Sequence, residues 1–330
     1  MEPFVYWKEP DGEDIFTIHN PVLFKPYPLL PLQTGFWLCP FWMEQGARLL
    51  RGEIVRADAT EMKLVATGYP TDFSPLGQPD YRSLVKIAVE QIDRGKFHKV
   101  VLARADEHPL PEGFDLKLFF SLLCSHYPSA FVYCVGMEDQ IWTGASPELF
   151  IRKQGGEFTT YALAGTRSNA ESDLFGEKER KEQGFVKEYI LDLLNELKAT
   201  SIRVSELSEL NTGQIIHLIN TIRFGCDSEK ELIERLHPTP AVCGYPLEGS
   251  RDFIRQNEGF PRDYYSGFLG PVRNSDDYAL WVNLRCARIA NQKIRYYAGA
   301  GIVHGSDPAS EWFETEKKMD TLRVFIGNDD

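Results

Sequence analysis

The sequence predicts an α+β protein built on large, mainly antiparallel sheets. Many short runs of β-branched and aromatic residues are bounded by Gly, Pro or Ser, as strands are. Two longer segments, 175–197 and 308–325, instead carry apolar residues at helical spacing. Strand-like and helix-like segments do not alternate regularly along the chain, which argues against a doubly wound parallel sheet.

Composition limits the size and the partners of the protein. The chain has 330 residues, of which 43% are hydrophobic and 25% charged, as is usual for globular proteins. At ~150 residues per domain we expect two parts, a short β-rich segment over 1–75 and a main domain over 76–330. A net charge of −12 argues against nucleic acid as a partner. No apolar run reaches ~20 residues and no signal peptide is apparent, so we expect a cytoplasmic protein without membrane contact.

The elements follow in order from local signals. Residues 1–75 are rich in Pro and aromatic residues and predict short strands and turns, with a linker over 68–79. A helix is predicted over 81–94 and is followed by a β-rich region. The expected strands there span 98–105, 130–136, 140–143, 148–152 and 158–164.

The second half opens and closes with long helices. In 175–197 the stripe of Val186, Ile190 and Leu193 has helical spacing. After a mixed region to about residue 262, strands are expected over 264–269, 278–289 and 293–298. Alternation within 278–289 places Arg285 on the face of Trp281 and Asn283. Asp307 is the expected N-cap of the last helix, with Pro308 at its first position.

Two pairs of glutamates extend the buried stripes of these helices. Glu179 and Glu182 lie three residues apart on one helix, and Glu311 and Glu314 on the other, with Lys318 one turn further on. Taken alone, each pair fits a solvated run of charges. Together, two such pairs have the oxygen ligands that Mg²⁺ prefers.

A resemblance to a known family rests on nine stretches in family order, from about residue 80 onward. They are 99–104, 144–149, 163–167, 177–182, 237–244, 265–270, 283–287, 298–303 and 306–314. Any one of them is weak, but all nine in order are highly specific. In these stretches the chain resembles the chorismate-utilising enzymes and, within them, the isochorismate synthases. The resemblance implies one two-lobed α+β domain with sheets back to back and helices outside.

The resemblance also implies a Mg²⁺ cofactor and a set of site residues. The metal ligands would be Glu179, Glu182, Glu311 and Glu314. Lys99 would be the base that activates water for attack at C2 of chorismate, and apolar neighbours would help it to lose its proton. Glu148 would be the acid that protonates the leaving C4 hydroxyl, for which it needs a water-poor site. The substrate would be held by Gly165, Thr166, His217, Tyr265, Arg285 and Lys318.

The choice within the family depends on Lys99. Relatives that use ammonia usually carry Gln at this position, so Lys99 favours water as the nucleophile, and no glutaminase subunit is expected. We therefore expect a monomeric isochorismate synthase that serves menaquinone or siderophore biosynthesis. A salicylate synthase, which also eliminates pyruvate, and a non-catalytic chorismate-binding protein are the alternatives. One departure from the family pattern is Gln183, where many relatives have His.

Overall fold

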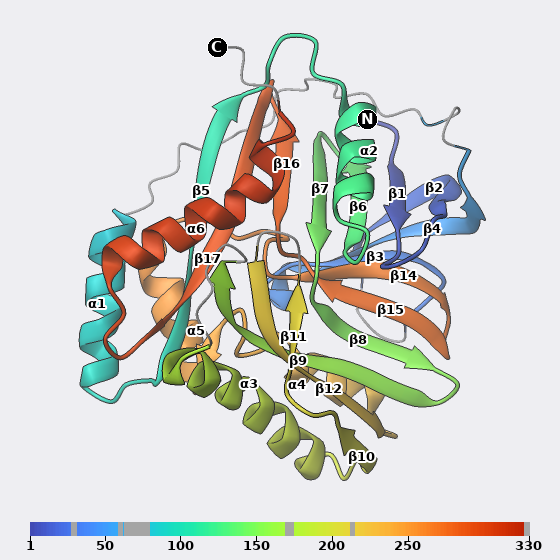
Figure 1. The fold of residues 1–330 in the computed structure, drawn as a ribbon. Coiled ribbons are helices and arrows are strands. Elements are labelled where there is room, and N and C mark those ends of the chain that lie inside the picture. Colours follow the sequence, from blue (N-terminus) through green and yellow to red (C-terminus); the bar gives the residue numbers. More distant parts are fainter. Residues whose placement is uncertain (28–31, 59–61, 63–79, 169–174, 212–214, 327–330) are drawn as a thin grey trace.

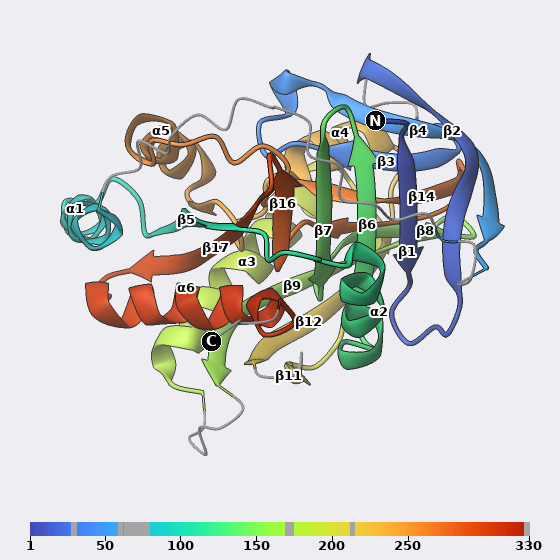
Figure 2. The same ribbon diagram turned by 90° about the horizontal axis from the view of Figure 1, so that it is seen from above.

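The computed structural model describes residues 1–27, 32–58, 62, 80–168, 175–211 and 215–326. Among these residues every strand pairing is antiparallel, and helices lie on the outside of the sheets (Figures 1 and 2). The predicted α+β class with large antiparallel sheets is confirmed.

The elements have the following bounds. The strands are β1 (Phe4–Lys8), β2 (Ile15–Tyr27), β3 (Gly35–Cys39), β4 (Ala47–Arg56), β5 (Lys99–Pro109), β6 (Phe131–Met137), β7 (Gln140–Ser146), β8 (Leu149–Gln154), β9 (Glu157–Ser168), β10 (Thr200–Val204), β11 (Ser208–Asn211), β12 (Ile215–Gly225), β13 (Gly244–Tyr245), β14 (Phe268–Asn274), β15 (Asp277–Val282), β16 (Cys286–Ala290) and β17 (Lys293–Val303). The helices are α1 (Tyr81–Asp93), α2 (Leu116–His126), α3 (Glu177–Glu196), α4 (Glu229–Leu236), α5 (Leu247–Asn257) and α6 (Pro308–Arg323).

The strands form two sheets joined through β2. The first sheet runs β2-β1-β6-β7-β16-β17-β5-β13. The second runs β2-β4-β3-β14-β15-β8-β9-β12, with β10 and β11 beside β12. The N-terminal strands are therefore built into both sheets. The predicted linker, and the boundary near residue 75, lie outside the described residues.

An aromatic layer fills the space between the two sheets. Trp7 and Phe131 come from the first sheet, and Phe36 and Trp281 from the second, and all four side chains are fully or almost fully buried. The rings of Phe131 and Trp281 stack with centroids 4.0 Å apart and planes 6° from parallel. Such offset or stacked pairs contribute beyond the area they bury. This layer confirms that the sheets pack back to back.

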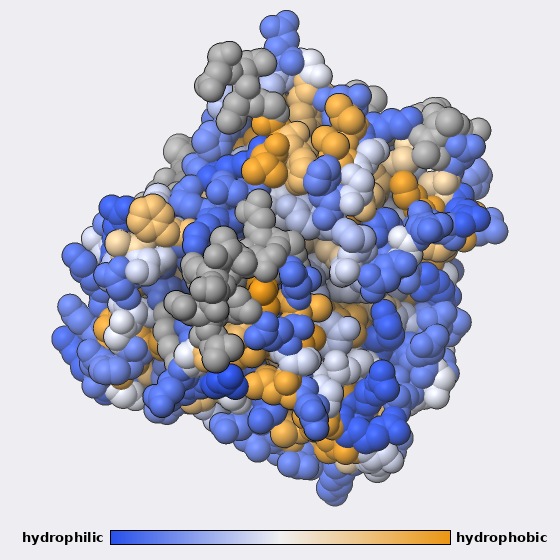
Figure 3. Space-filling model, in the orientation of Figure 1, coloured by the Kyte–Doolittle hydropathy of each residue, from blue (hydrophilic) through white to orange (hydrophobic). Residues whose placement is uncertain are grey.

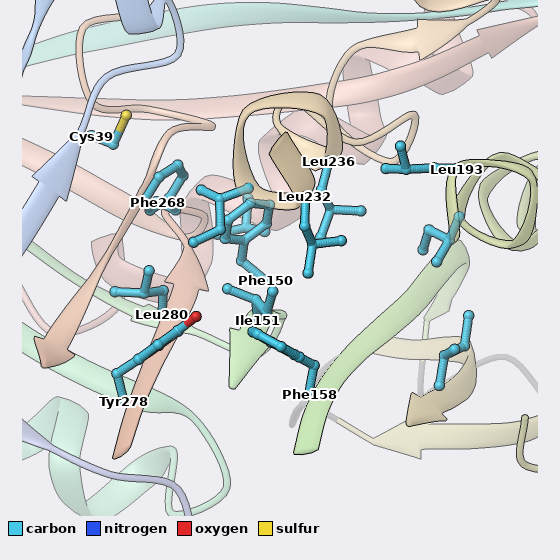
Figure 4. Packing of buried hydrophobic residues seen from close by; sticks show 14 of the residues in the cluster. Cys39, Phe150, Ile151, Phe158, Leu193, Leu232, Leu236, Phe268, Tyr278 and Leu280 are labelled. Atoms are coloured by element: carbon cyan, nitrogen blue, oxygen red, sulfur yellow. The ribbon is translucent and has the colours of Figure 1, made fainter. Parts of the chain in front are cut away.

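Helices cover the outer faces of the sheets. The apolar face of α3 packs with α4 on the second sheet, where Leu193 of α3 and Leu232 of α4 belong to the same buried cluster as Phe150 and Phe158 (Figure 4). Helices α2 and α6 lie on the first sheet (Figure 2). Helix α6 begins as expected, because the Asp307 side chain accepts a hydrogen bond from Ser310 N and Pro308 is its first residue.

The structure corrects three predictions. The expected strand over 278–289 is broken into β15 and β16, because Arg285 has a φ of 47°, outside the extended region. The expected strand over 264–269 begins only at Phe268, since the preceding residues form turns. Helices α2, α4 and α5 were not predicted; all three are short, at 8 to 11 residues.

The surface is mostly hydrophilic on the face shown in Figure 3, with apolar side chains in separate patches. The exposed large apolar residues come from different elements and are Val22, Ile87, Leu118, Val204, Leu207, Phe313 and Val324. Single exposed apolar residues are normal on globular proteins. Within the described residues, no helix has both the length and the apolar character to cross a membrane.

The aromatic layer predicts a large effect of one truncation. Trp281→Ala removes a fully enclosed ring from between the sheets, and we expect it to lower the free energy of unfolding by about 3–5 kcal/mol. Leu118→Ala, at a side chain that is 57% exposed, is the control and should change it by less than about 0.5 kcal/mol. Urea unfolding of both variants measures this. Equal effects would show that the layer does not hold the sheets together.

Candidate active site

One pocket brings together most of the predicted site residues. Its walls include Glu148, Gly165, Glu182, His217, Tyr265, Arg285 and Lys318. They come from the β7–β8 connection, β9, α3, β12, the turn before β14, the β15–β16 break and α6.

Lys99 is the first residue of β5 and is fully buried. Its Nζ lies 2.9 Å from Oε1 of Glu182, at an angle that does not make an aligned hydrogen bond. A buried ammonium needs such an anionic partner. The Lys99 carbonyl accepts a hydrogen bond from the Ser250 hydroxyl at 2.8 Å, which ties the strand to α5.

Two glycines of β17 make room for these groups. Gly299 and Gly301 pair with Ala103 and Val101 of β5. A methyl group on Gly301 would lie 2.3 Å from Oε1 of Glu182 and 3.1 Å from Cε of Lys99. On Gly299 it would lie 3.0 Å from the Tyr265 hydroxyl. The Ala-Gly-Ala-Gly sequence is therefore required by the close approach of the site residues to the strand.

Glu148 meets the requirement for a general acid. It is 2% exposed, and burial raises its pKa from 4.5 to about 8, although the nearby cations Lys99 and Lys318 lower it in part. The carboxyl group therefore keeps its proton at neutral pH. Its backbone is held in place because Val282 N donates to the Glu148 carbonyl.

A β-bulge turns the chain at Gly165. His217 of β12 pairs with Thr166 and Leu218 pairs with Ala164, so Gly165 is the extra residue of β9. Its φ is +73°, and a methyl group there would lie 2.9 Å from the Glu179 carbonyl. Glycine thus lets β9 approach the first turn of α3. The backbone of Thr166 lies beside Gly165, while its side chain lies outside the described residues.

Arg285 lines the pocket because the strand is interrupted at this residue. The alternation of side chains along a regular strand does not account for its position. Trp281 lies in the aromatic layer, whereas both Leu284 and Arg285 line the pocket. Asn283 holds the break, since its side chain donates to the Tyr264 carbonyl and accepts from the Tyr133 hydroxyl. The alternation inferred for this segment was wrong.

Arg285 and Lys318, with His217 beside Arg285, form what we call the cationic end of the pocket. Burial lowers the pKa of Arg285 to about 10, so this group stays charged at neutral pH. Its Nη2 lies 3.3 Å from Nε2 of His217, and burial, with Arg285 nearby, lowers the pKa of that imidazole well below its usual value. His217 is therefore neutral. Lys318 donates to Gly299 O at 2.8 Å and to Glu314 at 2.6 Å.

Of the four glutamates only Glu182 lines the pocket, and their side chains do not converge. Among the described residues, no group of three or more His, Cys, Asp or Glu is close enough to hold a metal ion. Glu182 is paired with Lys99, Glu314 with Lys318, and Glu179 accepts a hydrogen bond from Gly176 N. Glu311 is 1% exposed on the inner face of α6. Carboxylate oxygens are the donors that Mg²⁺ prefers, but this arrangement does not bring them together.

Some residues around the pocket were not predicted. The pocket is also lined by Ala241, Val242 and Leu284. The first two lie in the stretch 237–244, which contributes to the family resemblance but for which no site role was predicted. Gln183 donates to Asn220 Oδ1 at 2.6 Å and so ties α3 to β12. Glu258 and Arg262 form a buried ion pair behind β5. The sequence feature that could have revealed this ion pair is the presence of opposite charges four residues apart, just before Tyr265.

The fold and the pocket define an α+β protein that encloses a small-molecule site between antiparallel sheets and their covering helices. The chain belongs to the chorismate binding enzyme family, whose model matches residues 53–327. It is 29% identical to the isochorismate synthase DhbC of Bacillus subtilis over 326 residues, which cover 91% of this chain and 81% of that protein. It is 27% identical to the isochorismate synthase EntC of Escherichia coli over 327 residues, covering 94% and 82%.

Solved structures show the same fold. DhbC from Bacillus anthracis, described as a 2,3-dihydroxybenzoate-specific isochorismate synthase, matches with a TM-score of 0.82 at 24% identity, covering 99% of this chain and 96% of that one. Anthranilate synthase component I from Streptococcus pneumoniae matches with a TM-score of 0.70 at 19% identity, covering 97% and 89%.

The raised pKa of Glu148 predicts how stability depends on pH. Between pH 4.5 and 8 the folded protein keeps a proton that the unfolded chain releases, so the free energy of unfolding falls as pH rises. Glu148→Gln removes this contribution. We expect the wild type to lose roughly 1 kcal/mol per pH unit relative to Glu148→Gln in this window. Denaturant titrations of both proteins at pH 5, 6, 7 and 8 measure the difference, and parallel curves would contradict the raised pKa.

Proposed function

We propose that the protein is an isochorismate synthase, which converts chorismate to isochorismate with Mg²⁺. The observation that carries the proposal is that the buried carboxyl group of Glu148 lines the same pocket as Glu182, the partner of Lys99, and the cation Arg285. An acid, a lysine base and a bidentate carboxylate binder are the groups that this isomerisation needs.

Proton transfer is assigned to Lys99 and Glu148. Lys99 accepts a proton from water as the water oxygen bonds to C2 of the ring. Both ring double bonds shift, from C1=C2 to C6=C1 and from C5=C6 to C4=C5, and the C4 hydroxyl leaves as water with the proton of Glu148. One water is consumed and one is released, so the reaction is an isomerisation. The Glu148 pKa of about 8 keeps the acid protonated at neutral pH.

Substrate binding is assigned to the cationic end of the pocket. Arg285 presents a planar fork that can hold the enolpyruvyl carboxylate by two parallel hydrogen bonds, with the Tyr265 hydroxyl beside it. Neutral His217 adds no charge of its own there, and it keeps the guanidinium in place through its 3.3 Å contact. The Gly165 and Thr166 backbone and Lys318 would lie against the ring carboxylate and the C4 oxygen.

The metal site is assigned to Glu179, Glu182, Glu311 and Glu314. When bound, Mg²⁺ would neutralise the ring carboxylate and draw electron density away from C2 as a Lewis acid. A base role needs Lys99 as a neutral amine, whereas its ion pair with Glu182 needs an ammonium. If Glu182 bound the metal ion, Lys99 would lose this anionic partner. The role of Glu182 as a metal ligand is therefore compatible with the role of Lys99 as a base.

Product analysis tests the reaction. Purified protein with chorismate and Mg²⁺ should give an isomer of unchanged mass, separated by chromatography and identified by mass spectrometry. Salicylate together with pyruvate would instead show a salicylate synthase. Bound but unchanged chorismate would show a binding protein.

Two substitutions test the assignment of acid and base. Lys99→Ala and Glu148→Gln should each lower kcat by about 10²–10⁴-fold, because each removes a proton-transfer group. Chorismate binding, measured by calorimetry, should persist. Lys86→Ala and Glu90→Gln, at exposed positions of α1, are the matched controls and should keep full activity. Full activity in either active-site variant would remove that residue from the mechanism.

Metal removal tests the assigned ligands. Chelation should abolish turnover and added Mg²⁺ should restore it. Glu179→Gln and Glu314→Gln should raise the Mg²⁺ concentration for half-maximal activity by at least about 10-fold, since removing even a partner of a ligand commonly weakens metal binding this much. Glu188→Gln, at an exposed position of α3, is the control. Unchanged Mg²⁺ dependence in both active-site variants would place the metal elsewhere.

A further inference from the structure

A buried ion pair lies behind the strand that carries Lys99. Glu258 follows the last residue of α5 and is 2% exposed, and Arg262 is fully buried. The guanidinium meets the carboxylate through two hydrogen bonds of 2.6 Å, from Nε and from Nη2. Its carbon also lies 4.2 Å from the centroid of the Phe41 ring. Such a pair is costly to desolvate and by itself is weak evidence for a stabilising role.

The remaining side-chain hydrogen bonds of the pair all go to the backbone, at Val101 and Ala103 of β5 and at Val242. Arg262 Nη2 donates to Val101 O at 2.8 Å, and Nη1 donates to Val242 O at 2.9 Å. Ala103 N donates to Oε1 of Glu258 at 2.7 Å. Val101 and Val242 line the pocket. The Arg262 carbonyl in addition accepts from Tyr265 N.

These bonds replace a missing strand. On one edge β5 pairs with β17 over its whole length. On the other edge β13 pairs with Lys99 and Val100, Val101 N still donates to Cys243 O, and no described strand continues beside Leu102 and Ala103. There the pair bonds the carbonyl of Val101 and the amide of Ala103. One residue of a parallel neighbouring strand would bond the same two groups, so two side chains supply the donor and the acceptor that this buried backbone requires.

We propose that Glu258 and Arg262 are positioning residues, which act as a substitute strand and fix the position of β5, and with it Lys99, relative to the neighbouring pocket wall at Val242. This inference rests on the isochorismate synthase assignment for its catalytic consequence. The hydrogen bonds to the strand do not depend on that assignment. Neither side chain lines the pocket, so the pair acts through the backbone of Val101 and Ala103.

The test separates positioning from stability. In the double variant Glu258→Leu with Arg262→Met, both charges are removed together, and apolar replacement of a buried pair commonly leaves a protein folded. The bonds to β5 are lost, while the backbone bond to Tyr265 remains. We expect a folded protein with kcat lowered about 100-fold, as for a misplacement of about 1 Å, and KM within about 3-fold of the wild type.

A second readout does not depend on turnover. The amide of Ala103 should lose its protection from hydrogen exchange, measured by NMR, while amides of β5 that bond to β17 keep theirs. A folded double variant with wild-type kcat, or with an Ala103 amide as protected as before, overturns the proposal. If the wild type shows no isomer, the isochorismate synthase assignment fails, and amide exchange alone decides whether the pair holds the strand.

Two further variants complete the experiment. Arg262→Lys keeps the positive charge but removes the planar guanidinium group with its several N–H donors. It is the variant to use if the double variant does not fold. It should lower kcat by about 10-fold with little change in KM, and a wild-type kcat there would also overturn the proposal. Glu107→Gln is the matched control, because Glu107 lies at the far end of β5 and is paired with Arg295 at 2.7 Å. It should leave kcat unchanged.

Discussion

The site depends on the close approach of its functional side chains to β17 at two glycines. Without side chains at 299 and 301, the Lys99 amine and the Glu182 carboxylate fit against the strand. This approach puts charged groups where water is scarce, so each needs a partner supplied by the protein. The ion pairs of Lys99 and Lys318, and the protonated state of Glu148, are consequences of that requirement.

The same constraint explains why the site draws on elements far apart in the chain. An antiparallel sheet exposes few positions where a strand departs from regular pairing, and the pocket is lined at two of these. Gly165 is the extra residue of a bulge, and Arg285 interrupts what would otherwise be one strand. Each of these two irregularities places a residue at the pocket between β5, β9 and α6. Regular pairing elsewhere keeps these positions fixed relative to one another.

The parts of the fold that have a periodic or local signal in the sequence were predictable. The stripes of α3 and α6 and the cap at Asp307 gave those helices to within a few residues. The strand break at Arg285 was not predictable, because it needs a residue with positive φ that is held by Asn283 from a distant turn. The role of Glu258 and Arg262 was also hidden, since an unpaired strand edge is a property of the assembled sheet. The resemblance supplied the pocket residues that no local pattern could connect.

The N-terminal strands affect the order in which the molecule can assemble. β1 lies between β2 and β6, and β3 lies between β4 and β14, whose residues follow more than 200 positions later. Contacts so distant along a chain form slowly, because a large loop must close before they stabilise anything. During synthesis the first strands are made long before their partners leave the ribosome. The second sheet therefore closes late, and the edge of β3 that pairs with β14 stays unpaired during this long interval.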